Sequence, residues 1–157
     1  MGLFFWRNYH YRPRFHTETR RAVESIPLSE IQSLIDQQTA ILEWYISGET
    51  FLAFIVTSQG LKVWQSSAGD RDNLISFIEN YREAYENNKN EWIRNLNSFL
   101  NELSKILHMD EILNLIPKSC ERLIIIPHWF LHIIPLHCLP LKDGQFLGGD
   151  SVVVMAA

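Results

Sequence analysis

The sequence has little of what a cross-linked or redox-active protein needs. Among its 157 residues there are two cysteines, Cys120 and Cys138, and they do not form a C-x-x-C pair. A chain of this length that is 46% hydrophobic can bury one core without disulfides. We therefore expect one domain, no disulfide framework and a reducing, cytoplasmic setting.

Long apolar runs and an excess of positive charge are also missing. The apolar run near the N-terminus spans only residues 3–6, which is shorter than a signal-peptide core or a membrane span. The 14 Lys and Arg residues face 18 Asp and Glu residues, which gives a net charge of −4. This balance gives no general reason to expect a nucleic-acid or anionic-membrane partner. The sequence therefore predicts no export signal, no nucleic-acid partner and no membrane partner.

The first 22 residues differ in composition from the rest. They contain five arginines interleaved with Trp6, Tyr9 and Tyr11. Such a mixture also suits a weak contact with nucleic acid or lipid. We nevertheless interpret residues 1–22 as a disordered leader or linker remnant and place the folded domain at residues 23–157.

Hydrophobic patterning predicts an antiparallel unit near the start of the domain. Ser29 can cap a short helix that runs to about Gln37. Residues 39–47, 51–57 and 61–65 are strand-like and are separated by short turns. We expect these three strands to form a meander.

A long helical section follows, from Asp70 to Pro117, with a pause at residues 87–90. Asp70 or Asp72 can cap its first helix, and residues 112–116 make a last short helix. The predicted core of this section consists of two apolar stripes at helical spacing. The stripes are Leu74, Ile75, Phe77, Ile78, Tyr81 and Tyr85, then Trp92, Ile93, Leu96, Phe99, Leu100, Leu103, Ile106 and Leu107.

Residues 122–147 are the most unusual stretch of the chain. Leu123 to Ile126 predict a strand that is covered on both faces, as in a parallel sheet, and Pro127 ends it. Residues 151–157, SVVVMAA, predict another interior strand. Because that strand has no polar tail, we expect the chain to be interrupted there and its apolar edge near Val152–Val154 to cause self-association or poor solubility.

The loop that follows Pro127 contains His128, His132, His137 and Cys138. These residues suit either a reactive or metal-binding site or the packing of the loop. A zinc site is disfavoured because Pro135 interrupts any helix that would align two histidines, and no H-E-x-x-H glutamate is present. A nucleophilic thiol is disfavoured because sequence adjacency does not orient the His137 ring toward the sulfur. We assign no catalytic, cofactor-binding or metal-binding residue and expect a buried, inert Cys138.

From about Ile26 to the C-terminus, the sequence resembles the N-terminal half of a CHAT domain, a caspase-like module of the clan that contains separases and gingipains. The resemblance rests on the strand pair of residues 40–64, on the helical middle, and on LIIIPHWFLHIIPLHCLPL followed by Gly144–Leu147. It implies an α/β, caspase-like but partial sheet, and it implies that the His132 ring anchors the loop by hydrogen bonds. The matching motif positions, all structural, are Pro127, Leu131, His132, Pro135, Leu139 and Pro140.

The resemblance also implies a function without catalysis in this chain. The catalytic His and Cys of the family lie C-terminal to the matched part, so neither carries over to a residue here. We expect a truncated CHAT-domain protein that acts as a scaffold or interaction module for a protein partner or for the remainder of a CHAT protein. The alternative is the non-catalytic half of a caspase-like cysteine endopeptidase.

Overall fold

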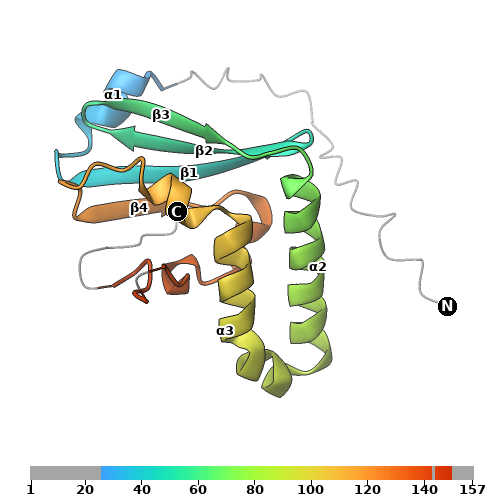
Figure 1. Cartoon of the computed structure of the whole chain (residues 1–157). Helices are drawn as coiled ribbons and strands as arrows, with labels where there is room; N and C mark the ends of the chain where they lie inside the picture. The colour runs from blue at the N-terminus through green and yellow to red at the C-terminus, as the bar shows by residue number, and fades with distance from the viewer. Residues whose placement is uncertain (1–25, 143, 150–157) are drawn as a thin grey trace, which may run out of the picture.

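The computed structural model describes residues 26–142 and 144–149. They form a mixed α/β unit in which a four-stranded sheet packs against helices (Figure 1). The strands are β1 Thr39–Ser47, β2 Thr50–Thr57, β3 Gly60–Gln65 and β4 Arg122–Ile126. The helices are α1 Leu28–Ser33, α2 Asp70–Asn87, α3 Lys89–Ile106 and α4 Met109–Leu113, followed by the 3-10 turns η1 Trp129–Ile133 and η2 Leu136–Cys138.

The strand order is β3-β2-β1-β4, antiparallel except for the parallel β1–β4 pair. The first three strands are the predicted meander, with bounds within one residue of those expected. Strand β4 returns beside β1 only after the whole helical section, because parallel neighbours require a long crossover. The predicted α/β class is confirmed at this level.

The main core lies on one face of the sheet. Alternation along β1 buries Ala40, Leu42 and Trp44 completely, and β4 adds Leu123 and Ile125 on the same side. Helices α2 and α3 form a hairpin below this face, whereas α1 lies above the sheet at one end (Figure 1). The predicted coverage of β4 on both faces is wrong, because its burial alternates and Ile124 and Ile126 are only half-buried.

One asparagine separates the two long helices. Asn88 has an extended backbone with φ −154°, and its side-chain oxygen accepts a hydrogen bond of 3.2 Å from the Glu91 N–H. It therefore ends α2 and caps α3 at the predicted pause. At the start of α2, Gly69 with φ 93° occupies the cap position, and Asp70 instead accepts a hydrogen bond of 2.8 Å from the Ser67 N–H.

Several sequence-based expectations about helices need correction. Ser29 lies inside α1 and does not cap it, and the last short helix is Met109–Leu113 rather than residues 112–116. The first helix ends at Ser33 rather than near Gln37, because Asp36 accepts hydrogen bonds from the Gln38 N–H and the Thr39 hydroxyl in the turn that enters β1. In the predicted core stripes, Ile93 and Tyr85 are exposed. Ile93 lies at the edge of its apolar stripe, and Tyr85 lies in the last turn of α2, so the two-helix layer leaves both uncovered.

Residues 1–25, 143 and 150–157 are outside the description, and they include the predicted leader and the predicted SVVVMAA strand. Within the described ranges, no helix combines the length and the hydrophobicity that crossing a bilayer requires.

Truncation of a core side chain from α3 tests this packing. Leu103 is fully buried between the helices and the sheet, so Leu103→Ala should lower the free energy of unfolding by about 2–5 kcal/mol. The matched control is Ile93→Ala on the same helix, where the side chain is 59% exposed and a change within about 0.5 kcal/mol is expected. Urea denaturation followed by circular dichroism measures both, and equal losses would contradict the assigned helix face.

Candidate functional site

The loop Pro127–Pro140 leaves the sheet where the parallel strands β1 and β4 end. The carboxyl ends of parallel strands are the usual place for binding sites in α/β proteins. Buried Leu131, Leu136 and Leu139 attach this loop to the core. Trp129 at its start has a left-handed backbone with φ 55°, a strained conformation for an aromatic residue, and its exposed ring stacks on Phe130 at 3.9 Å.

A histidine does anchor the loop, but it is His128 rather than His132. The Nδ1 atom of His128 accepts a hydrogen bond of 3.3 Å from the Ile46 N–H, and its ring lies 5.1 Å from the Tyr45 ring. His132 is exposed and forms no hydrogen bond with any part of the chain that the structure describes. The expected ring anchor at His132 is therefore not found there, because η1 directs Leu131 inward and leaves His132 outside.

The histidines and cysteines of the loop do not converge. His137 is exposed and Cys138 is half-buried, and no hydrogen bond joins their side chains. In residues 26–142 and 144–149, no group of three or more His, Cys, Asp or Glu side chains is placed to hold a metal ion.

The other thiol, Cys120, lines a cavity of about 260 Å³ beside the start of β4. Burial, and secondarily the nearby Asp36 carboxylate, raise the pKa of Cys120. The thiol is therefore protonated at neutral pH and is a poor nucleophile.

Residues 139–149 fold back on themselves and close the loop. The Leu141 N–H donates to the Gln145 carbonyl and the Leu147 N–H to the Leu139 carbonyl, each at 2.8 Å. The Ser104 hydroxyl on α3 donates to the Pro140 carbonyl at 2.8 Å, which fixes the Leu139-Pro140-Leu141 segment to the helical hairpin. A Cβ atom at Gly148 would lie 2.9 Å from the His137 carbonyl oxygen, so this close return requires glycine.

A second cavity, of about 420 Å³, lies between α2, α3 and the loop, and we call it the aromatic cavity. Its wall consists of Tyr81, Arg82, Tyr85, Glu86, Trp92, Ile133 and Pro135. The Trp92 ring meets the Tyr81 and Tyr85 rings edge to face, with centroids 5.6 and 5.2 Å apart. Burial raises the pKa of the Tyr81 hydroxyl, which therefore stays a hydrogen-bond donor. Among the motif positions, Pro135 lines this cavity.

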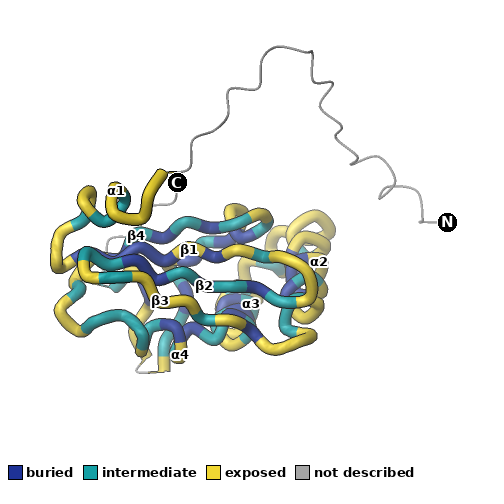
Figure 2. The backbone as a smooth tube through the Cα atoms, turned by 90° about the horizontal axis from the view of Figure 1, so that it is seen from above, coloured by how far each residue is buried: buried dark blue, intermediate teal, exposed yellow. Residues whose placement is uncertain are grey.

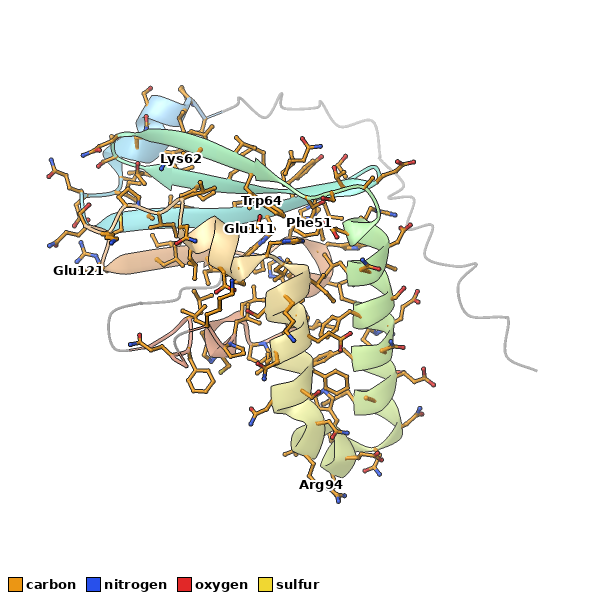
Figure 3. All side chains as sticks on the ribbon, in the orientation of Figure 1. Phe51, Lys62, Trp64, Arg94, Glu111 and Glu121 are labelled. Carbon is orange, nitrogen blue, oxygen red and sulfur yellow. The ribbon has the colours of Figure 1, made fainter. Side chains whose placement is uncertain are left out.

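Sequence reasoning did not find a polar cluster below β3. His108, with φ 50°, places its ring between two carboxylates: Nε2 lies 3.4 Å from Asp70 Oδ2 and Nδ1 lies 3.3 Å from Glu111 Oε1. The Trp64 indole lies tilted against this imidazole, with ring centroids 5.0 Å apart, and its N–H donates to Glu111 Oε2 at 3.1 Å. Figure 3 shows Trp64 and Glu111 between the sheet and α4, with Lys62 on the same side of β3.

The partners of this cluster come from α2, α4 and β3, so no short motif marks it. The one local signal is the spacing of His108 and Glu111, three residues apart at the start of a helix. The cluster connects the edge strand to both helices and is part of the fold's support rather than an open site.

Comparisons with known proteins do not add to this geometry. No family model matches the sequence, and no curated protein matches it.

The two histidine positions give a matched test of the loop anchor. His128→Ala should lower the free energy of unfolding by about 1 kcal/mol, because the Ile46 N–H loses its acceptor. His132→Ala should change it by less than about 0.5 kcal/mol, since that side chain is exposed. Thermal melting of both variants measures the two losses. A larger loss of stability for His132→Ala than for His128→Ala would show that His132, and not His128, anchors the loop.

The Glu111 carboxylate should make stability depend on pH. Hydrogen bonds from His108 and then Trp64 lower the pKa of Glu111 from its usual value of 4.5. A lowered folded-state pKa means that ionised Glu111 stabilises the fold above pH 4.5 and that this contribution is lost as pH falls through the folded pKa.

We therefore expect Glu111→Gln to flatten the fall in Tm below pH 4.5. The control is Glu102→Gln on the exposed side of α3. Melting curves from pH 6 down to about pH 3 measure the slopes. If Glu111→Gln and the wild type lose Tm equally over this range, the cluster does not hold the carboxylate as described.

Proposed function

We propose that this chain carries the N-terminal half of a CHAT-type, caspase-like domain and acts as a protein-interaction module without peptidase activity of its own. The observation that carries the proposal is the aromatic cavity, which opens between the helical hairpin and the loop with the L-H-x-x-P motif. Pro135 belongs both to that motif and to the cavity wall. This shared position supports a role of the motif in binding a partner.

The composition of the cavity favours a protein partner. Aromatic rings and arginine supply most of the energy at the centres of protein interfaces, and Tyr81, Tyr85 and Trp92 meet here beside Arg82. Their edge-to-face contacts hold the rings in place before a ligand arrives, which reduces the entropy lost on binding. The volume of about 420 Å³ suits one apolar anchor side chain and its flanking backbone.

The rim of the cavity can select the neighbours of such an anchor. Arg82 Nη2 lies 3.2 Å from Glu86 Oε1, and both side chains are largely exposed. An exposed ion pair of this kind is weak, so either partner can exchange it for a charge on an incoming peptide. We expect the bound segment to present a large apolar residue next to a charged or polar one.

The thiols give no support to a peptidase activity of the chain alone. Catalysis by cysteine needs a thiolate and an imidazole within hydrogen-bond reach. In the described residues, no imidazole is hydrogen-bonded to Cys120 or Cys138, and the pKa of Cys120 is raised. These observations favour binding over hydrolysis.

A second candidate is the non-catalytic half of a caspase-like cysteine endopeptidase. The strained Trp129 at the carboxyl end of the parallel strand pair favours it, because such backbone conformations concentrate at functional sites. In this reading, the nucleophile and its base come from outside the described residues.

Peptide selection tests the interaction module. Peptides selected from a displayed library on the full 157-residue chain should bind through the aromatic cavity. Tyr85→Ala should weaken the best peptide by about tenfold or more, because the anchor loses an aromatic wall. Fluorescence polarisation of the labelled peptide measures Kd for each variant.

Ile93→Ala is the matched control, since Ile93 is an exposed apolar residue on α3 that does not line the cavity. It should leave Kd unchanged. A selected peptide that binds Tyr85→Ala as tightly as the wild type would contradict the assigned site. If the chain cleaves a basic-residue peptide library and Cys138→Ala abolishes the cleavage, the chain is a peptidase and the proposed interaction module is contradicted.

A further inference from the structure

One face of the sheet is turned away from α2 and α3, and we call it the open face. Two rows of its side chains lie beyond the end that α1 covers. The strand registers align Ile126, Glu43, Phe54 and Val63 in one row and Tyr45, Leu52 and Gln65 in the next. Figure 2 views the molecule from this side, with the strands in front of the helical hairpin. In the described residues, the His128 ring contacts Tyr45, and no helix covers these rows as α2 and α3 cover the other face.

The end of the open face near α1 is already covered. The Gln32 side chain of α1 donates a hydrogen bond of 2.9 Å to the Thr57 carbonyl at the end of β2. Near this contact, the cross-strand pair Ile41 and Val56 is buried even though it faces away from the helical hairpin. The segment upstream of β1 therefore enters the fold on the open face and begins to cover it.

The two remaining rows are apolar and nearly uncharged. Tyr45 is 47% and Val63 is 52% exposed. Leu52 and Phe54 on β2, between these strands, and Ile126 on β4 are half-buried. Glu43 is the only charged side chain in these rows. An apolar strip of this kind on a monomer marks a surface that another segment covers.

The composition of residues 1–25 matches this strip. Residues 3–15 include six aromatic side chains, and residues 1–25 contain five arginines and two glutamates, a net charge of +3. The rest of the chain carries nine basic and sixteen acidic residues, a net charge of −7. The basic and aromatic part of the sequence is thus concentrated immediately before the point where the chain reaches the open face.

Geometry permits the contact within one molecule. The described chain starts at Ile26, next to α1 on the open-face side (Figure 1). Twenty-five residues can span about 80 Å when extended, whereas the strands are about 30 Å long. The reach exceeds the distance to the farthest row, and tethering makes the local concentration of this segment high.

We infer that residues 3–15 dock in cis on the open face, with aromatic side chains over the Ile126-to-Val63 row and an arginine beside Glu43. A second copy of the chain fits this face less well, because each copy without its first 25 residues carries a net charge of −7 and presents Glu43 at the centre of the strip. The inference does not depend on the aromatic cavity or on peptidase chemistry.

Photo-crosslinking in the full-length chain tests this inference. We would place p-benzoylphenylalanine at Val63 on the open face and, as the matched control, at Ile93 on α3, which is similarly exposed. A one-to-one mixture of ¹⁴N- and ¹⁵N-labelled protein is irradiated, and mass spectrometry identifies the joined peptides. We expect same-label crosslinks from position 63 to residues 1–25 and none of these from position 93.

A charge reversal refines the test. Glu43→Lys should reduce the crosslink yield at position 63 by about two- to fivefold, the worth of one exposed ion pair, and added salt should act in the same direction. Mixed-label crosslinks would show that a second copy covers the open face and would overturn docking in cis. Absence of residues 1–25 from the products, or equal yields at positions 63 and 93, would overturn it as well.

Discussion

The parallel pairing of β1 with β4 is the interaction on which the rest of this structure depends. It joins residues 39–43 to residues 122–126, so the meander, both long helices and α4 all belong to one closed crossover. The start of this pair is fixed by charge: Asp36 accepts from Arg122 and from Thr39, and the Arg122 Nε donates to the Thr39 hydroxyl at 3.0 Å. These bonds lower the pKa of Asp36, so the junction holds at neutral pH.

The same crossover explains why the sheet has two unlike faces. With α2, α3 and α4 on one side, the side chains of β1 that point down, such as Leu42 and Trp44, become fully buried, whereas Tyr45 remains exposed. All-parallel sheets are covered on both faces, whereas a sheet that is antiparallel except for one pair, as here, can leave one face uncovered. Among the described residues, the uncovered part of this face is therefore a result of the order of elements rather than of a local defect.

The strands and the break between the long helices could be predicted from the sequence because local rules determine them. Strand-like runs separated by short turns that contain Gly48 and Gly60 mark residues 39–65, and an asparagine that can cap a helix marks position 88. The sidedness of β4 could not be predicted, since Leu123–Ile126 are apolar at every position and only the tertiary arrangement decides which of them face solvent. The exposure of Ile93 has the same cause.

The loop after β4 shows most clearly what could not be predicted from the sequence. Its residue types suggested chemistry, and the motif suggested an anchor at His132, but which histidine meets the sheet is decided by the tertiary pairing of β4 with β1, which no local pattern marks. His128 follows β4 by two residues with an extended backbone, and the pairing of Ile126 with Glu43 places its ring near the Ile46 N–H. The cluster around His108 is likewise assembled from three elements separated by up to 47 residues.

These two histidines differ in what they can do, although both are partly buried. His128 uses one ring nitrogen to accept from the backbone and stacks on Tyr45, so it holds the end of β4 against β1. His108 has a carboxylate at each ring nitrogen and an indole against its face, so it joins three elements. Within the described residues, both rings are therefore used to hold elements of the fold together: His128 joins the loop to β1, and His108 joins β3, α2 and α4.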